Sequence, residues 1–464
     1  MRIAIIGAGL AGLVSAYSIH KQQPEAKVEV FEATDRIGGK LFTVPFDSGP
    51  TDMGAEAYLA FRKDATEFFE ELNLGGEIVD PSGLPSLLYV DGELHAMPMA
   101  TVMGIPGSSE GLEGLVSEES RARIDAEGEA EPIPWALDKE VSVGALVRER
   151  YGDDVVEHVV SALQGGVYSS TSDDLGLRAT MPQIANTFDA MLAEGQPVTL
   201  SGAVKRIMAA RPVARGYKPK VFGAFRGGYA QAYEALAEQS GADIHIDAFI
   251  SQISRTKEGF KLKGADGVFD RVLLAVPAPT AAVLLKGLGE DAQVAAEQLK
   301  RIPLASSVVV GMKFDDEEGL PDNSGILVAT DAKDVRAKAF TFSSKKWPHL
   351  GERGGALVRA SFGRYGDDAI TRMEEDELVD LALDDLQRIT GFDGRAAGLS
   401  EIFVQRWFGG LPVYNVEHLD AVAAARDALA KVPGIEATGA WDQGVGVPDV
   451  IVAAKDAAER VLGS

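Results

Sequence analysis

The order of apolar and polar positions predicts a strand, a helix and a second strand at the start of the chain. Residues 2–6 are apolar and rich in β-branched side chains, which is typical of a buried strand. Residues 10–20 have a helical pattern, and residues 28–32 have that of a second strand. A strand–helix–strand unit of about 30 residues implies a right-handed crossover between parallel strands. The opening therefore predicts an α/β domain.

Helical and strand patterns continue to the end of the chain. We expect helices at three later places: 64–73, 140–163 and 172–193. We expect further strands, or β-rich stretches, at 243–255, 259–264, 269–277 and 306–362. The last segment, 432–462, has the pattern of a strand, a glycine-rich turn and a final helix that starts at Pro448.

Charge and composition limit the possible partners. The 464 residues include 45 Lys and Arg, 70 Asp and Glu and 0 Cys, with a formal net charge of −25. This acidity argues against nucleic acid or an anionic membrane surface as a general partner. The lack of cysteine excludes disulfides, thiolate metal sites and cysteine nucleophiles, and it fits a reducing cytoplasm. No metal site is expected.

Two segments need separate interpretations. Residues 3–19 carry no charge, but they are fewer than the ~20 that a membrane span needs, so we expect no stable membrane insertion. Residues 107–133 are acidic and contain Gly and Ser. We interpret them as a solvated loop or a helical surface insertion.

A glycine-rich motif follows the first strand. Gly7, Gly9 and Gly12 have G-x-G-x-x-G spacing, and Glu32 stands at the end of the second strand. In this context the glycines allow a tight turn and a close approach of the pyrophosphate of a dinucleotide to a helix N-terminus. The acidic residue is placed to accept hydrogen bonds from a ribose. Because a second glycine-rich turn lies near the C-terminus, we expect a discontinuous dinucleotide-binding domain.

Several motifs resemble those of flavoproteins. Glu32, Arg36, Gly38, Gly39 and Lys40 form an E-x-x-x-R-x-G-G-K pattern. It resembles the branch that contains amine oxidases, phytoene desaturases and protoporphyrinogen-type oxidases. Four further segments are similar to oxygen-dependent porphyrinogen oxidases: GGVYSS at 165–170, SSKKWPH at 343–349, QRWFGGLPVYNVEH at 405–418 and GVGVPD at 444–449. Many flavoproteins have a Gly-Asp pair in their C-terminal motif, whereas this chain has Gly439-Ala440 at that place. A hydrogen bond between an aspartate and the ribitol is therefore not expected there.

The resemblance implies FAD as the cofactor and an α/β (α+β overall) fold. That fold has a discontinuous Rossmann-like FAD-binding domain, an inserted mixed β-sheet substrate domain and a helical domain. The expected segments are 1–92 (FAD-binding and the start of the substrate domain), 93–205 (mostly helical), 206–285 (FAD-binding), 286–430 (substrate-binding) and 431–464 (FAD-binding). The expected cofactor-binding residues are Gly7, Ala8, Gly9, Leu10, Ala11, Gly12, Glu32, Ala33, Lys40, Gly54, Ala55, Glu56, Ala57, Ile250, Trp407, Val445, Gly446 and Val447.

The implied reaction is the oxidation of coproporphyrinogen III to coproporphyrin III in haem biosynthesis. It takes three two-electron steps with O2 as acceptor and H2O2 as by-product. The alternatives are a protoporphyrinogen IX oxidase and an FAD-dependent amine oxidase. A ferrochelatase is expected as a transient partner by pathway logic. The flavin accepts the hydride, and no acid–base residue is assigned.

Carboxylate side chains of such a substrate require cations. Arg62 and Lys345 are the main candidates, and further candidates are Lys63, Arg226, Lys346 and Arg359. Gly166, Tyr168 and Tyr414 are expected to form walls of the substrate pocket.

Overall fold

The strand–helix–strand opening is present and forms the centre of a five-stranded sheet. It consists of β1 (Arg2–Ile6), α1 (Leu10–Gln22) and β2 (Lys27–Phe31). β1 pairs in parallel with β2 on one side and with β15 (Arg271–Leu274) on the other. The sheet order is β12-β2-β1-β15-β21, in which β12 is Asp243–His245 and β21 is Ile435–Ala437. This confirms the predicted α/β class.

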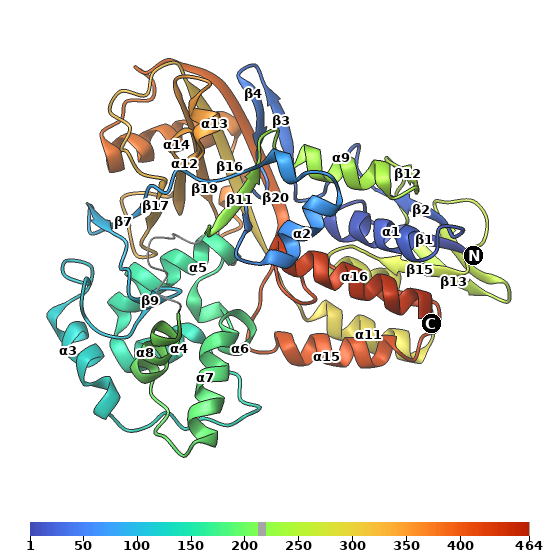
Figure 1. Ribbon diagram of the computed structural model, residues 1–464, viewed down its shortest axis with the longest axis horizontal. Coiled ribbons are helices and arrows are strands. Elements are labelled where there is room, and N and C mark those ends of the chain that lie inside the picture. Colours follow the sequence, from blue (N-terminus) through green and yellow to red (C-terminus); the bar gives the residue numbers. More distant parts are fainter. Residues whose placement is uncertain (212–219, 464) are drawn as a thin grey trace. The chain divides into compact units, whose positions relative to one another are not determined.

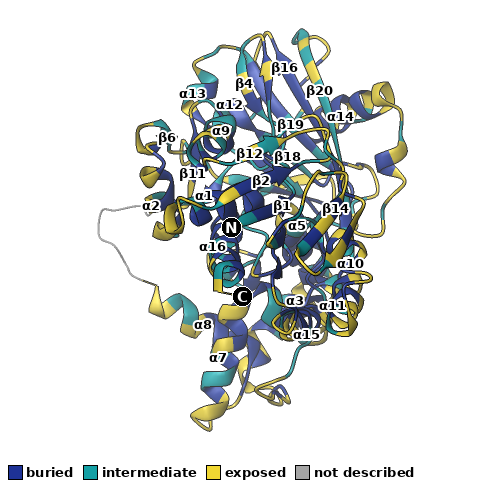
Figure 2. Cartoon of the chain, turned by 90° about the vertical axis from the view of Figure 1, so that its right-hand side faces the viewer, coloured by how far each residue is buried: buried dark blue, intermediate teal, exposed yellow. Residues whose placement is uncertain are grey.

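Successive side chains of β1 pack into two different cores. Ile3 and Ile5 lie in one core and Ala4 and Ile6 in the other, as the two-residue period of a strand requires. Helices of the first core are α1, α2 (Lys63–Glu71), α9 (Ala230–Gln239) and α16 (Val447–Gly463). Helices of the second core are α10 (Ala278–Leu284), α11 (Glu290–Lys300) and α15 (His418–Leu429). The central strands β1 and β2 are therefore covered on both faces and buried after their first residues, whereas the edge strand β12 is partly exposed (Figure 2).

The computed structural model describes residues 1–211 and 220–463, and the chain divides into two units (Figure 1). Unit 1 comprises Met1–Pro81, Pro219–Pro303 and Leu419–Ser464, and unit 2 comprises Ser82–Lys218 and Leu304–His418. Unit 1 is thus assembled from three separate stretches of chain. The boundaries of the units differ from those of the five expected segments, which stay a prediction.

Short strands complete unit 1. They are β3 (Thr43–Phe46), β4 (Gly49–Asp52), β5 (Tyr58–Leu59), β6 (Ile78–Val79), β11 (Phe222–Phe225), β13 (Gln252–Thr256) and β14 (Gly259–Lys263). The strand expected at 243–255 is interrupted, because Asp247 has a positive φ of 52° between β12 and β13.

Unit 2 contains a seven-stranded mixed sheet in the order β20-β16-β19-β18-β17-β7-β8. Its strands are β7 (Ser86–Val90), β8 (Glu93–Ala96), β16 (Leu304–Phe314), β17 (Gly325–Val328), β18 (Ala339–Phe342), β19 (Ala356–Phe362) and β20 (Leu399–Pro412). α14 (Glu375–Thr390) packs its apolar side chains on this sheet. Short elements are β9 (Thr101–Val102), β10 (Ile105–Pro106), α12 (Ser343–Lys346) and α13 (Pro348–Gly351).

The helical part of unit 2 is more divided than expected. It contains α3 (Glu118–Ala126), α4 (Val143–Tyr151), α5 (Ser161–Tyr168), α6 (Leu177–Thr180), α7 (Pro182–Ala193) and α8 (Leu200–Ala210). The helices expected at 140–163 and 172–193 are therefore wrong as continuous elements. α4 ends at Gly152, whose φ is 117°, and a π-helical segment, Val155–Val160, precedes α5. α7 starts with Pro182, which lacks the N–H that a continuous helix needs.

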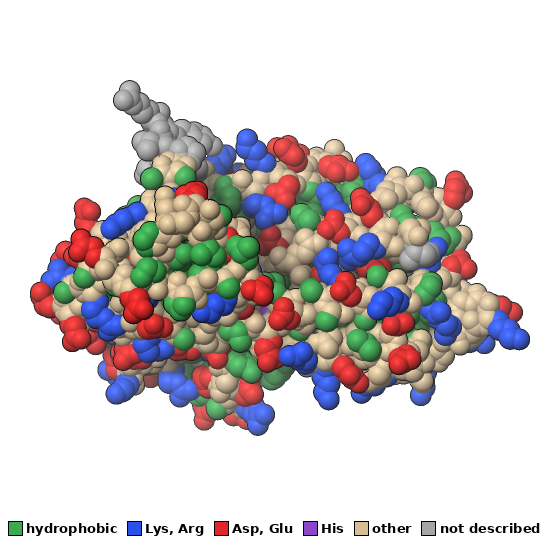
Figure 3. Space-filling view, turned by 90° about the horizontal axis from the view of Figure 1, so that it is seen from below, with side chains coloured by type: hydrophobic (Ala, Val, Ile, Leu, Met, Phe, Trp, Pro, Cys, Tyr) green, Lys and Arg blue, Asp and Glu red, His purple; other side chains and the backbone are tan. Residues whose placement is uncertain are grey.

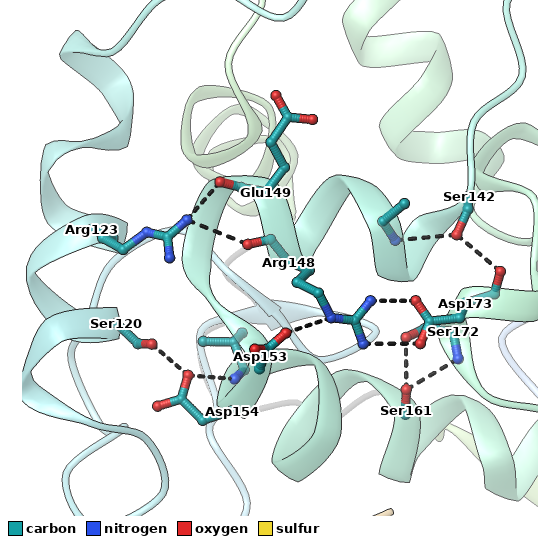
Figure 4. Close-up of polar contacts among 12 residues, drawn as sticks. Ser120, Arg123, Ser142, Arg148, Glu149, Asp153, Asp154, Ser161, Ser172 and Asp173 are labelled. Carbon is teal, nitrogen blue, oxygen red and sulfur yellow. Dashed lines mark hydrogen bonds and ion pairs between the residues drawn. The ribbon is translucent and has the colours of Figure 1, made fainter.

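Polar contacts join these short helices. Arg148 of α4 donates to Asp153 at 2.6 Å and pairs with Asp173 at 2.5 Å (Figure 4). The hydroxyls of Ser161 and Ser172 are 2.6 Å apart. These bonds connect the ends of elements that the sequence pattern could not separate.

The acidic segment 107–133 is a helical insertion that packs within unit 2, so the second of its two interpretations is confirmed and the solvated loop is wrong. Leu112 and Ile124 are fully buried, and α3 lies within the segment. Glu127 is buried as well. Its carboxylate accepts hydrogen bonds from the N–H groups of Leu200 and Ser201, both at 2.8 Å. Arg150 pairs with it at 2.8 Å. An acidic residue of this segment thus caps α8.

Among the described residues, no helix is long and apolar enough to cross a membrane. Acidic and basic side chains are interspersed over the face that Figure 3 shows.

We expect Glu127→Leu to lower the free energy of unfolding by about 3 kcal/mol or more. The substitution leaves the partly buried Arg150 without its carboxylate and two N–H groups of α8 without their acceptor. Urea unfolding followed by circular dichroism measures this loss. Glu129→Gln, at an exposed position of the same turn, is the matched control and should be neutral. Equal stabilities of the two variants would refute the role of Glu127 as a cap.

Candidate cofactor site

Three segments expected to bind the cofactor meet at the carboxyl end of β1. The first is the glycine turn at 7–12, the second is the E-x-x-x-R-x-G-G-K motif at 32–40, and the third is formed by residues 54–57. The N–H of Gly38 donates to the carbonyl of Ala8 at 2.8 Å, which joins the second motif to the first. The N–H of Ala55 donates to the carbonyl of Lys40 at 3.2 Å, which adds the third. Gly54 is required there, because a Cβ on it would lie 2.0 Å from the carbonyl oxygen of Lys40. The backbones of the three motifs are therefore in direct contact.

The meeting point is a topological switch of the parallel sheet. The chain leaves β1 for β2 on one side, while β15 pairs with β1 on the other. In open parallel sheets, ligands bind outside the carboxyl ends of the strands at such a switch. The location is therefore that of a dinucleotide site.

Glu32 fixes the shape of the first turn. One oxygen of its carboxylate accepts the N–H of Ala8 at 2.9 Å, and the other accepts the N–H and the hydroxyl of Thr34 at 2.9 Å. A carboxylate has about four acceptor positions, so it can still accept a ribose hydroxyl. The side chain thus links the turn after β1 to the end of β2, and ribose binding by Glu32 stays a prediction.

The segment that contains Ile250 lies beside Glu32. The N–H of Ala248 donates to the carbonyl of Glu32 at 2.8 Å, and the N–H of Asp247 donates to that of Thr34 at 2.8 Å. Ile250 is 4% exposed and packs in the second core of the sheet. The structure therefore places residues 247–250 next to Glu32, where the ribose is predicted to bind.

The first turn has room for a ligand at Gly9. A Cβ on Gly12 would lie 1.9 Å from the carbonyl oxygen of Gly7, so packing inside the protein already demands that glycine. A Cβ on Gly9 would meet no atom closer than 3.7 Å, and its φ is −76°. The protein itself thus does not require a glycine at this position. The fit to a pyrophosphate explains it, because a side chain would fill the space that the phosphates need.

The N-terminus of α1 also suits a phosphate. No side chain of the described residues caps this helix, and its first turn contains no acidic residue. The first N–H groups of a helix have no partner inside the helix, and the helix dipole favours an anion at that end. The residues present therefore fit a dinucleotide.

Lys40 supplies a positive charge to the same region. Its side chain is partly buried and forms no ion pair or hydrogen bond with the described residues. Desolvation lowers the pKa of its ammonium group to about 8. Arg36 differs, because it donates to the carbonyl of Gly39 at 2.8 Å and lies over the ring of Phe42. Lys40 is therefore the cation of this motif that is left for a phosphate.

The C-terminal motif reaches the same core through α16. α1 and α16 lie side by side, and the hydroxyl of Ser15 donates to the carbonyl of Ala454 at 3.1 Å (Figure 1). The helix begins at Val447, next to the expected Pro448. Val445 and Gly446, expected to line the flavin, are partly buried in the turn before it.

Arg62 has a different environment from the one expected. Its guanidinium pairs with Asp449 at 2.5 Å and with Asp64 at 2.8 Å. Asp449 packs against the turn that precedes α16, because a Cβ on Gly446 would lie 2.8 Å from its carboxylate. Two carboxylates already neutralise Arg62, so we assign it to holding this turn and do not carry it into the substrate proposal.

The sequence analysis missed two buried carboxylates, Glu436 and Asp442, which lie just before the C-terminal glycine-rich turn. Asp442 is ion-paired with Arg426, and Glu436 pairs with Arg460 at 2.8 Å. Burial raises the pKa of both carboxyl groups. Asp442, three positions after Gly439, was the available signal in the sequence. Its partner Arg426 could not be identified from the sequence, because it lies on a separate helix, α15.

The remaining expected cofactor residues occupy varied positions. Ala8, Leu10 and Ala11 are buried, Ala33 is exposed, and Glu56 and Ala57 are partly buried. Trp407 lies in β20 of unit 2 and is partly buried. Its contact with the cofactor stays a prediction.

Of the expected substrate-binding residues, unit 2 brings three together. Gly166 and Tyr168 lie on α5, and the ring of Tyr168 is 6.1 Å from that of Tyr414. Lys345 is different, because it pairs with Asp322 at 3.0 Å and with Glu317 at 3.3 Å. Since its charge is balanced, it is not carried further as a substrate-binding residue.

Comparisons with known proteins agree with this geometry. Residues 10–462 match the model of a family described as flavin containing amine oxidoreductase. A coproporphyrinogen III oxidase of Mycobacterium tuberculosis is 36% identical over 464 residues, which is 99% of this chain and 96% of that protein. A coproporphyrinogen III oxidase of Bacillus subtilis is 29% identical over 481 residues, which is 99% of this chain and 97% of that protein.

A solved structure has the same fold. It is a putative protoporphyrinogen oxidase from Exiguobacterium with a TM-score of 0.86 and 27% identity, covering 100% of this chain and 99% of that one. The resemblance to porphyrinogen oxidases and the fold class are thus confirmed, and the cofactor is FAD.

Replacement of Gly9 by Ala should weaken FAD binding without unfolding the protein. The added methyl group meets no protein atom closer than 3.7 Å but occupies the phosphate space. Overpacking by such a group costs about 1–3 kcal/mol, which is roughly 5- to 150-fold in the dissociation constant. Flavin absorbance after reconstitution gives the constant, and circular dichroism checks the fold. Gly76→Ala, which also has free space around it, is the control. A fully flavinated Gly9→Ala protein would contradict the assignment.

FAD affinity should depend on pH through Lys40. The free ammonium group has a pKa of about 8, and a bound phosphate raises this pKa because it favours the charged form. Affinity is therefore constant below pH 8 and falls as the pH rises above it, by up to about tenfold per pH unit. Titration of the apoprotein with FAD between pH 6.5 and pH 9 measures this. Lys40→Met should bind weakly at every pH, whereas Lys21→Met, at an exposed position of unit 1, should behave as wild type. The same slope in Lys40→Met would exclude Lys40.

Proposed function

The chain belongs to the family of flavin-containing amine oxidoreductases, and we propose that it oxidises coproporphyrinogen III to coproporphyrin III. The observation that carries this proposal is full-length similarity to proteins named coproporphyrinogen III oxidase, at 36% identity. Relatives at 29% identity carry the same name.

The proposed reaction removes six electrons and six protons from the porphyrinogen in three two-electron steps. In each step a meso C–H gives up a hydride and one proton is released, so that the conjugation of the ring extends. Over the three steps each of the four meso carbons loses one hydrogen and the four pyrrole nitrogens lose two protons in total, so one of the three released protons comes from a meso carbon by tautomerisation. When bound, FAD supplies the two-electron acceptor for the hydride and returns the electrons to O2, with two protons, as H2O2. Three O2 are thus consumed and three H2O2 released for each porphyrin formed.

The residues of this chain bind and orient. The N-terminus of α1 and Lys40 are placed to hold the phosphates, and Glu32 keeps the first turn in shape. Arg62 and Asp449 keep the turn before α16 in place. No acid–base residue is assigned, because each released proton can pass to water.

Two parts of the proposal concern the cell. We place the reaction in the cytoplasm, because a chain with 0 Cys fits a reducing compartment. We also include transient transfer of the product to a ferrochelatase, since a metal-free porphyrin needs an enzyme that inserts iron.

A protoporphyrinogen IX oxidase is the second candidate. The solved structure with a TM-score of 0.86 is named a putative protoporphyrinogen oxidase, which favours this substrate as an alternative. The two substrates differ in their number of carboxylates, so direct competition separates them. An amine oxidase is the third candidate, on the family description alone.

The test is an aerobic assay of the purified holoprotein with each porphyrinogen supplied separately. We expect rapid formation of fluorescent coproporphyrin III above the enzyme-free rate, with equal uptake of O2 and release of H2O2. If only protoporphyrinogen IX reacts, the proposed oxidation of a porphyrinogen is retained and the proposed substrate is replaced by protoporphyrinogen IX. H2O2 formation with polyamines and no reaction with either porphyrinogen would replace the proposal by an amine oxidase.

A further inference from the structure

Two neighbouring cations of unit 2, Lys338 and Arg364, have no carboxylate partner among the described residues. Lys338 immediately precedes β18, and Arg364 follows β19 two residues after its end. In the part of the chain that the structure describes, neither forms an ion pair with an acidic side chain. Other cations of this unit do, such as Arg178 with Asp189 at 2.7 Å. In a chain with 70 acidic and 45 basic residues, an unbalanced pair of cations needs an explanation.

Both cations are costly where they lie. Lys338 is 4% exposed, and Arg364 is partly buried. Desolvation lowers the pKa of Lys338 to about 7, and repulsion from Arg364 adds to this effect. Desolvation also lowers the pKa of Arg364, while Asp367 opposes it. Burial of like charges without a counter-ion is typical of sites that bind an anion.

Donors remain unused on both side chains. The ammonium group of Lys338 has three N–H donors. It gives one to the hydroxyl of Ser169 at 2.6 Å and one to the carbonyl of Gly363 at 2.8 Å. Arg364 donates from Nη2 to the carbonyl of Val328 at 3.5 Å. Its Nε is buried and has no hydrogen-bond partner among the described residues. One N–H of Lys338 and the Nη1 of Arg364 form no hydrogen bond within the described part of the chain and are left for an acceptor.

The backbone around these cations comes from α5. A Cβ on Gly165 would lie 3.4 Å from Nε of Arg364, so the helix passes directly beside the guanidinium group. The N–H of Tyr365 donates to the carbonyl of Ser169 at 2.7 Å, which ties the end of α5 to the turn after β19. Gln164, on the same helix, is fully buried, and its carboxamide has no hydrogen-bond partner in the part of the chain that the structure describes. α5 carries Gly166 and Tyr168, which are expected to line the substrate pocket.

We propose that Lys338 and Arg364 bind one carboxylate of the substrate beside α5. This proposal rests on the proposed function, and it names the residues that recognise a carboxylate-bearing tetrapyrrole. The guanidinium group of Arg364 donates to a carboxylate in fixed, planar directions, and the ammonium group of Lys338 adds a compact positive charge. Local positive charge of this kind lets a chain with a net charge of −25 hold a polyanion.

The experiment uses the FAD-loaded protein and the variants Arg364→Gln and Arg364→Lys. We expect Arg364→Gln to raise KM for coproporphyrinogen III about tenfold while kcat changes less than twofold, because the lost contact is distant from the oxidised carbon. The dissociation constant for coproporphyrin III, measured by fluorescence quenching, should rise by a similar factor. Arg364→Lys should restore part of the affinity, because it keeps the charge.

Controls separate this proposal from the function on which it rests. Arg395→Gln removes an arginine of the same unit that pairs with Asp380 and Asp384, and it should leave KM unchanged. Lys338→Met should raise KM and weaken porphyrin binding as Arg364→Gln does. If Lys338→Met does not fold, the result with Arg364→Gln decides the question. If the wild type is active and Arg364→Gln has unchanged KM and porphyrin affinity, the carboxylate site is overturned and the function stands. Wild-type protein that neither oxidises nor binds any porphyrin overturns both.

Discussion

The pairing of β1 with both β2 and β15 is the constraint on which the rest of unit 1 depends. It places one parallel strand at the centre and requires partners from three distant stretches of chain. Because β1 is buried on both faces, its alternating side chains need two separate layers of helices. The cofactor site follows from this arrangement, since the carboxyl end of β1 directs the chain into the glycine turn and α1.

Close backbone contacts then convert separate motifs into one site. The hydrogen bonds from Gly38 to Ala8 and from Ala55 to Lys40 join three loops without any ligand. Gly9 is the exception among the glycines of the first turn, because the space beside it is not used by the protein. The site is thus preformed in its backbone, and the FAD phosphates account for the position that packing leaves open.

Both units combine neutralised acidic groups with cations that lack an acidic partner among the described residues. Buried acidic groups are neutralised internally, such as Glu127 by Arg150 and two helix N–H groups. Asp442 is neutralised by Arg426 in the same way. Lys40 in unit 1 and the pair Lys338 and Arg364 in unit 2 have no acidic partner within residues 1–211 and 220–463. The excess of acid in the chain therefore coexists with local positive sites, which suits an anionic cofactor and a substrate with carboxylates.

The sequence by itself determined the α/β class, the first strand–helix–strand unit, the glycine motifs and the family resemblance. These features depend on neighbouring residues, whose spacing sets local conformation. Only the tertiary structure decided which charges are balanced. Arg62 and Lys345 were expected to bind substrate, but their acidic partners include Asp449, which is 387 residues away from Arg62, and Asp322. Glu127 was expected in a solvated segment and instead caps a helix that begins more than 70 residues later. Pattern along the chain cannot reveal such pairings, because burial and ion pairing depend on which distant segments the fold brings together.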